Sequence, residues 1–237
     1  MDVNRNFVPH FLDVNSFENL SSLIISAIAF AWPDTLPALN LPQLRYLSWN
    51  TELPAEGDIR FISRSSFPAL RELDAFLVCR SPADYSGLRK VIQRMSLRRL
   101  GLKLISIKDL DELLPLVNAA YFSIYQPPFL PGFAQVIPPS VVTLEISRVS
   151  TARWVKDLVT LLTELFSLGV NTNVRRVIIG SVYGRWFSWT DVEDDAQSAH
   201  SSTFLGVMLV YSNRLAKKGI RLLDFNQQSL DAVTHTV

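Results

Sequence analysis

The amino-acid sequence predicts an α/β fold in which parallel strands and covering helices stack along the chain as a solenoid. Three observations support this prediction. A short apolar phrase recurs every few tens of residues. Stripes of apolar residues at helical spacing lie between the phrases. The chain has 237 residues and is 48% hydrophobic, which supplies enough apolar surface for one continuous core.

The recurring phrase is an aliphatic residue, two variable residues, a second aliphatic residue, one variable residue and an apolar residue. It begins at residues 20, 44, 70, 97, 119, 141, 174 and 220. Most of these intervals fall in or near the roughly 20–29 residues typical of leucine-rich repeats. Arginine follows the first aliphatic in five copies: Arg45, Arg71, Arg98, Arg175 and Arg221. We therefore expect a leucine-rich-repeat-like solenoid of about six to eight units, a short horseshoe or arc with strands on the concave face and helices on the convex face.

Helices are predicted between the phrases, over residues 85–95, 152–168 and 202–218, because apolar residues recur there every three or four positions. Gly169 and Gly219 follow the last two of these segments and are suited to ending them. Residues 109–114 offer only a turn or two before Pro115, which is expected to interrupt the helix.

Length, charge and cysteine content define the expected organisation. A repeat domain at 20–226 is predicted between an N-terminal segment at 1–19 and a C-terminal tail at 227–237. The net charge of +1 favours neither nucleic acid nor a membrane surface as a partner. Cys79 is the only cysteine, the N-terminal residues do not resemble a signal peptide, and the most apolar stretch is too short to span a bilayer. An intracellular protein, cytoplasmic or nuclear, is therefore expected.

Three segments carry a family resemblance. The segments LPALNLPQLRYLSW, FPALRELDAF and LRRLGLKLISIKDLDELLPLV resemble the divergent leucine-rich regions of fungal F-box proteins. The resemblance covers residues 20–226 and implies a repeat arc that holds a substrate protein for a Skp–cullin ubiquitin ligase. Residues 1–19 are too few for the F-box helix bundle that docks onto this ligase, so no F-box is expected in this chain.

The variable residues of the phrases are predicted to face a protein partner, because alternate residues of a strand point to opposite sides of the sheet. Tyrosine and arginine, which are enriched among interface hot spots, are frequent at these positions. The predicted protein-binding residues of the concave face are Tyr46, Glu72, Asp74, Arg99, Lys103, Tyr121, Tyr125, Glu145 and Arg176. The alternative is a solvated sheet whose neighbouring charges pair with each other.

A connector after the phrase at 174 is unusually aromatic and forms a second candidate site. Its predicted protein-binding residues are Tyr183, Arg185, Trp186 and Trp189, and acidic residues follow at 191–195. The alternative, which we favour, is that Trp186, Phe187 and Trp189 fold back as a plug over the core.

No catalytic, metal or cofactor site is predicted. The three histidines have no metal-ligand spacing, and a single cysteine disfavours a structural zinc site. The nine glycines form no phosphate-binding loop or dinucleotide fingerprint. We therefore predict a non-enzymatic protein–protein interaction module. Two alternatives stay open: an enzyme on a doubly wound α/β sheet, and a truncated gene product without independent function.

Overall fold

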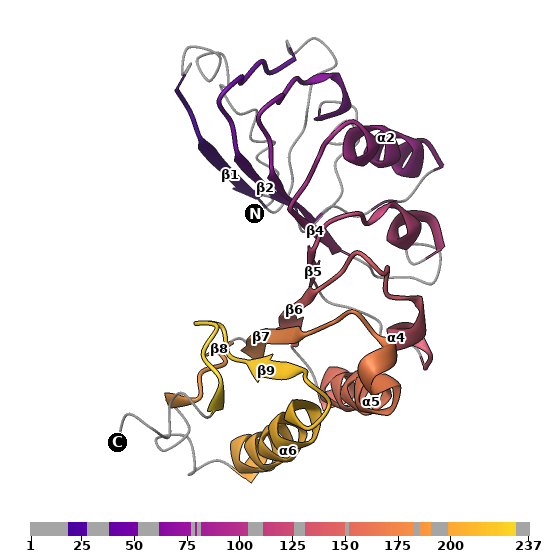
Figure 1. The fold of residues 1–237 in the computed structure, drawn as a ribbon. Helices are drawn as coiled ribbons and strands as arrows, with labels where there is room; N and C mark the ends of the chain where they lie inside the picture. The colour runs from indigo at the N-terminus through magenta and orange to yellow at the C-terminus, as the bar shows by residue number, and fades with distance from the viewer. Residues whose placement is uncertain are drawn as a thin grey trace, which may run out of the picture. The chain divides into compact units, whose positions relative to one another are not determined.

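A computed structural model describes most of the chain as two compact units. The described residues are 19–27, 38–51, 62–76, 79, 82–103, 111–125, 131–149, 152–182, 185–190 and 199–230. Unit 1 consists of Met1–Lys103 and Lys108–Ala119, and unit 2 of Leu104–Ile107 and Ala120–Val237. Both units are α/β with mostly parallel strands, which confirms the predicted class (Figure 1). Most of the N-terminal segment and most of the tail lie outside the described residues.

Among the described residues, the sheet of unit 1 contains four parallel strands in chain order. These are β1 (Ser22–Ala27), β2 (Tyr46–Thr51), β3 (Glu72–Phe76) and β4 (Arg99–Lys103). Each strand begins two residues after the first residue of a phrase. The turns that enter the strands repeat, because the carbonyl oxygens of Ser21, Arg45 and Arg71 each accept two successive N–H groups from the next strand. This shared turn sets the same register at each step.

The aliphatic positions of the phrases form the core of both units, as the phrase predicts. In unit 1 six of the phrase leucines are at most 1% exposed, namely Leu44, Leu47, Leu70, Leu73, Leu100 and Leu102, whereas Leu20, Leu23 and Leu97 are half-buried. α2 (Pro82–Gln93) adds Tyr85, Leu88 and Val91 to this core. Burying one such side chain contributes roughly 1.5–3 kcal/mol relative to leaving it exposed, so the phrases dominate the stability of the sheet.

The described part of unit 2 contains three parallel strands in chain order and two short strands that share one edge. The parallel strands are β5 (Tyr121–Tyr125), β6 (Thr143–Val149) and β7 (Arg176–Val182). β8 (Arg185–Trp186) pairs antiparallel with the end of β7, and β9 (Arg221–Leu223) pairs parallel with its beginning. β8 was not predicted, because it belongs to the aromatic connector and has no phrase.

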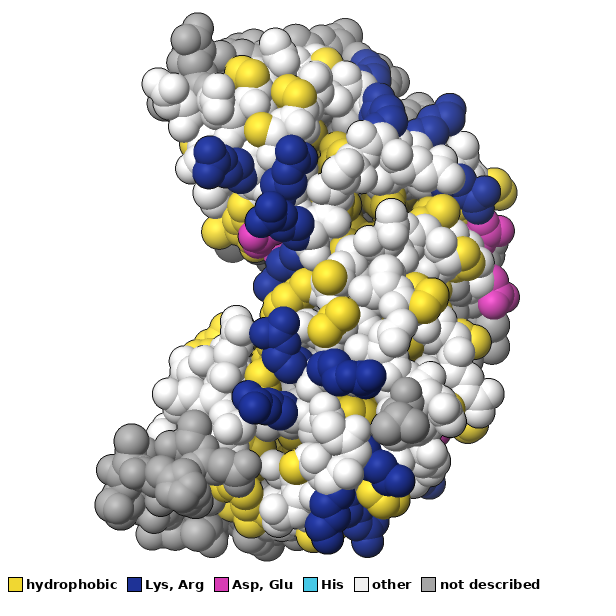
Figure 2. All heavy atoms as spheres, in the orientation of Figure 1, with side chains coloured by type: hydrophobic (Ala, Val, Ile, Leu, Met, Phe, Trp, Pro, Cys, Tyr) yellow, Lys and Arg dark blue, Asp and Glu magenta, His cyan; other side chains and the backbone are white. Residues whose placement is uncertain are grey.

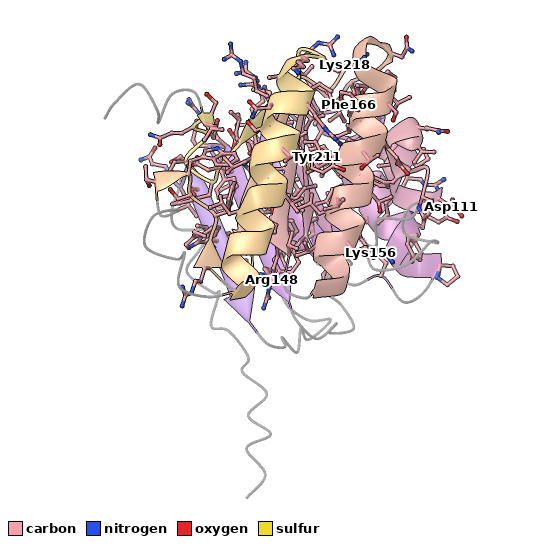
Figure 3. All side chains as sticks on the ribbon, turned by 90° about the horizontal axis from the view of Figure 1, so that it is seen from below. Asp111, Arg148, Lys156, Phe166, Tyr211 and Lys218 are labelled. Carbon is pink, nitrogen blue, oxygen red and sulfur yellow. The ribbon has the colours of Figure 1, made fainter. Side chains whose placement is uncertain are left out.

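The helices of unit 2 are α4 (Phe133–Val136), α5 (Ala152–Leu168) and α6 (Ala199–Ala216). Figure 3 shows α5 and α6 side by side, with Tyr211 on α6 directed toward α5. The Tyr211 hydroxyl lies 2.6 Å from Thr163 Oγ1, and the Lys218 ammonium lies 5.3 Å from the centroid of the Phe166 ring. None of the described helices combines the length and apolar content that crossing a bilayer requires.

The predicted helices are confirmed with small shifts at their ends. α5 spans the predicted residues, whereas α2 and α6 each begin three residues earlier than predicted. Gly169 and Gly219 adopt positive φ values of 51° and 75°, which suits glycine at a helix end. The α-helical residues 111–113 end before Pro115, as predicted, and Pro115 itself lies in the 3₁₀ turn η2 (Leu114–Leu116). At the start of this turn the missing N–H of proline costs no hydrogen bond.

The last phrase is aligned one residue away from its prediction. β9 pairs Leu222 with Val177 and Leu223 with Ile178, so Leu222 rather than Leu223 continues the core row. A one-residue shift turns every side chain to the opposite face, and Leu222 is accordingly 1% exposed. The fifth phrase arginine is therefore not equivalent to the other four.

Candidate binding surface

Three side chains from successive strands of unit 1 form a hydrogen-bonded cluster on the sheet face. The Tyr46 hydroxyl on β2 donates to Asp74 Oδ2 at 3.0 Å, and Arg99 Nε on β4 lies 3.2 Å from Asp74 Oδ1. Asp74 is 3% exposed, whereas the Arg99 side chain is 25% exposed. Burial of the phenol, followed by the negative charge of Asp74, raises the pKa of Tyr46 above 10.0. Tyr46 is therefore a neutral hydrogen-bond donor at neutral pH.

Gly101 makes room for this cluster. It lies directly opposite Asp74 in the register of β3 and β4. A Cβ atom at Gly101 would overlap the Asp74 carboxylate and lie 2.9 Å from Cε1 of Phe76. A side chain at this position would therefore displace the carboxylate from its place between Tyr46 and Arg99.

Burial changes the role of two residues predicted to contact a partner. Asp74 and Lys103 are only 3% and 8% exposed, so both belong to the interior of the surface rather than to its accessible part. Asp74 is buried because Tyr46 and Arg99 from the two neighbouring strands both contact its carboxylate. Tyr46 is half-buried and Glu72 is exposed, and with Arg99 they form one row across three strands.

Unit 2 carries a second polar cluster, built around Glu145. The Tyr121 hydroxyl donates to Glu145 Oε2 at 2.7 Å, and Ser147 Oγ donates to Glu145 Oε1 at 3.2 Å. Ser147 Oγ is also 2.6 Å from Ser123 Oγ, which is fully buried. Arg176 is exposed on the neighbouring strand. The structure thus brings Tyr121, Glu145 and Arg176 together on adjacent strands of one sheet.

Tyr125 has a partner that the sequence did not indicate. A β-bulge between Ile124 and Tyr125 aligns Tyr125 with Arg148, whose Nη1 donates to the Tyr125 hydroxyl at 2.7 Å. The guanidinium carbon of Arg148 also lies 5.9 Å from the centre of the Tyr125 ring. The phrase assigns Arg148 to no row because a bulge leaves no mark in the hydrophobic pattern.

The aromatic connector divides into a buried part and an exposed part. Phe187 and Trp189 are 8% and 3% exposed, and Phe187 packs against Phe204 of α6 with ring centroids 5.8 Å apart. Trp186 is 66% exposed and contacts the Phe225 ring at 5.6 Å. The plug interpretation therefore fits Phe187 and Trp189 but not Trp186.

Of the predicted connector site, Arg185 and Trp186 are exposed. Tyr183 and the acidic residues 191–195 lie outside the described residues. Trp189 is held in place by its backbone, since its N–H donates to Asp224 Oδ2 at 3.1 Å. Asp224 is fully buried and also accepts the Gln228 N–H at 2.8 Å, so this carboxylate anchors the connector to the last strand.

Three exposed arginines of unit 1 were not predicted as a site. Arg45, Arg71 and Arg98, here called the arginine row, immediately precede β2, β3 and β4. They line one depression of about 480 Å³ together with Tyr46, Ala69 and Glu72. Figure 2 shows Lys and Arg side chains gathered on this face of unit 1. Their recurrence at one offset of the phrase is the sequence signal for this row.

The described side chains offer binding groups rather than a metal centre. No group of three or more His, Cys, Asp or Glu residues that could hold a metal ion occurs in the part of the chain that the structure describes. A comparison with protein-family models, curated proteins and solved structures finds no match to this chain. The two clusters, the connector and the arginine row are therefore the features that bear on function.

Proposed function

We propose that this protein is a leucine-rich-repeat-like solenoid whose strand face binds a segment of another protein. The observation that carries the proposal is the alignment of side chains from equivalent phrase positions across neighbouring strands. In unit 1 Tyr46 is the register partner of Glu72, and Glu72 is the register partner of Arg99. In unit 2 the row contains Tyr121, Thr143 and Arg176. Such rows present mixed charge and aromatic area on a rigid backbone.

The chemistry of these rows suits recognition of a polypeptide. Arginine and tyrosine supply large contact areas and directional hydrogen bonds, and they dominate measured interface hot spots. The buried Asp74 orients Tyr46 and Arg99 from beneath, so little side-chain entropy remains to be lost on binding. The exposed Glu72 adds an acceptor beside them. A partner segment with complementary polar groups would thus meet a surface that is already ordered.

Strand order favours a binding module over the alternative enzyme. Doubly wound α/β enzymes bind their ligands where the strand order reverses and loops from both directions meet. Within each unit the long parallel strands follow chain order without such a reversal. The described site residues also lie along the strands rather than on glycine-rich loops at their ends.

The resemblance to fungal F-box proteins narrows the proposal further. In that family the leucine-rich region selects the substrate of a ubiquitin ligase. We therefore assign this chain the role of a substrate-recognition region. Ligase recruitment would be supplied by Skp and cullin components acting through an F-box in the same gene product.

Affinity capture tests this proposal. The full chain is expressed with a tag in its native cell, and captured proteins are identified by mass spectrometry. Alanine at Glu72, Arg99, Tyr121 and Tyr125 should reduce capture of the partner about tenfold or more, since it removes several potential hot spots. Recovery of Skp and cullin subunits would distinguish a ligase receptor from a generic adaptor.

A matched control separates loss of the surface from loss of the fold. Alanine at four exposed positions on or beside the helices, Lys90, Gln93, Lys156 and Lys217, removes a similar amount of side chain away from the strand face. Both variants should retain the circular dichroism spectrum of the wild type. A folded strand-face variant that captures its partner as well as the control does would contradict the proposed site.

A further inference from the structure

We infer that the arginine row of unit 1 is a docking site for an acidic segment of the protein partner. The inference rests on the proposed function and specifies which chemistry the partner brings. Arg45, Arg71 and Arg98 come from three consecutive repeats within unit 1, and they line a single depression. A single cation is common on a protein surface, whereas three arginines from equivalent phrase positions around one depression form a concentrated positive site.

The backbone holds these arginines at a fixed spacing. The carbonyl of Arg45 accepts the N–H groups of Arg71 and Glu72, and the carbonyl of Arg71 accepts those of Arg98 and Arg99, at 2.7–3.2 Å. Neighbouring parallel strands lie about 4.8 Å apart, so the three side chains leave the backbone at that interval. The row is therefore a line of regularly spaced positive charges that runs across the strands.

Ion pairs with described residues do not neutralise the charges of the row. Among the described residues neither Arg45 nor Arg98 has an ion-pair partner, and the Arg71 guanidinium donates to the Leu70 carbonyl at 3.1 Å. The buried acid of the same sheet, Asp74, is already engaged by Arg99 and Tyr46. Among the described residues that line the depression, three are cationic and one, Glu72, is anionic.

An acidic peptide matches this arrangement better than a nucleic acid does. Guanidinium groups bind carboxylates with two parallel hydrogen bonds, and each contact relieves repulsion between neighbouring arginines. A row that crosses three strands fits several carboxylates spread along an extended segment. The chain as a whole has a net charge of +1 and a pI of about 7.9, which lacks the broad basic excess of nucleic-acid-binding domains. Ala69 and the neutral Tyr46 add apolar area for the peptide backbone.

Fluorescence anisotropy with labelled probes tests the inference on the full chain. The probe is a ten-residue peptide that alternates glutamate with serine, and its comparison peptide has glutamine in place of glutamate. Replacing the arginine row by glutamine (R45Q, R71Q and R98Q together) should weaken binding of the acidic peptide about tenfold or more. Rising salt should weaken the wild-type complex, because the contacts are exposed charges.

A matched variant controls for net charge. Lys90, Lys156 and Lys217 are exposed on or next to helices, and their replacement by glutamine (K90Q, K156Q and K217Q together) lowers the net charge by the same amount. This variant should bind the acidic peptide within about twofold of the wild type. Equal loss in the two triple variants would overturn the inference, because it would show attraction by net charge alone.

Two further probes test the identity of the ligand. Tighter binding of a single-stranded RNA oligonucleotide, or of a peptide carrying phosphoserine in place of one glutamate, would overturn the assignment to a carboxylate-rich segment. Failure here is distinguishable from failure of the proposed function. If the arginine-row variant still captures the cellular partner and the strand-face variant does not, the strand face stands and the docking site for an acidic segment is wrong.

Discussion

Both units have the same diagonal tyrosine–carboxylate contact on the strand face, but the two carboxylates differ in their other partners. In unit 1 the Tyr46 hydroxyl donates to Asp74, which lies two residues beyond the register partner of Tyr46 on the next strand. In unit 2 Tyr121 donates to Glu145, at the same offset. Equivalent phrase positions thus carry a tyrosine followed, one strand later, by a carboxylate.

The difference lies on the third strand. Opposite Asp74 stands Gly101, whereas opposite Glu145 stands Ile178, which is 3% exposed. The space above Gly101 lets the Asp74 carboxylate lean toward Arg99 and form a partly buried ion pair. In unit 2 the carboxylate accepts hydroxyl hydrogen bonds from Tyr121 and Ser147. One residue on the neighbouring strand therefore decides how a repeated carboxylate is satisfied.

The largest expected effect comes from filling the space at Gly101. Gly101→Val should lower the free energy of unfolding by about 3 kcal/mol, because the new side chain overlaps the Asp74 carboxylate and the Phe76 ring. Urea denaturation followed by circular dichroism measures this loss. Gly206 of α6 is the control, since a Cβ there has no neighbour within 4 Å. Gly206→Ala should be neutral or stabilise the protein by up to about 1 kcal/mol. An unchanged urea midpoint for Gly101→Val would contradict the role given to this glycine.

The two carboxylates are expected to contribute differently to the stability of the protein. Asp74→Ala should cost about 2–3 kcal/mol, because it leaves the largely buried Arg99 guanidinium without its ion-pair partner. Glu145→Ala removes hydrogen bonds from two partly buried hydroxyls and should cost only about 1 kcal/mol. The same urea experiment ranks the two variants. Equal losses would show that the ion pair adds nothing to the shared tyrosine–carboxylate contact.

The sequence predicted much of the fold because burial of the aliphatic residues decides it. Each of the eight phrases supplies a strand, since residues such as Leu44 and Leu144 must leave water and can do so only on one face. The helices follow for the same reason, and α5 was predicted to the residue. A strong hydrophobic period in the sequence thus predicts the positions of strands and helices.

Features that depend on register were not predictable from the phrase. The shift at β9 and the bulge at Tyr125 each move the pairing by one residue without changing the local apolar pattern. The burial of Asp74 and Lys103 depends on side chains from neighbouring strands, which the period cannot place. The arginine row needed the same information, because only register shows that Arg45, Arg71 and Arg98 line one depression.

The smallest expected effect concerns the ionisation of Tyr46. Its pKa lies above 10.0, first because the phenol is buried and then because Asp74 carries a negative charge nearby. The folded protein thus holds the phenolic proton more tightly than the unfolded chain does. This contribution to stability is complete below about pH 10 and is lost as the pH rises through the raised pKa.

Tyr46→Phe removes this titration together with one hydrogen bond to Asp74, which is worth about 1 kcal/mol. The variant should therefore be less stable than the wild type at pH 8, and the difference should narrow above about pH 10 as the wild type loses stability. Urea midpoints measured at both pH values give this difference, and the remaining tyrosines cancel because the two proteins share them. A gap that stays constant across this range would show that Tyr46 ionises in the folded protein as readily as in the unfolded chain, and the buried contact with Asp74 would then carry no pH dependence.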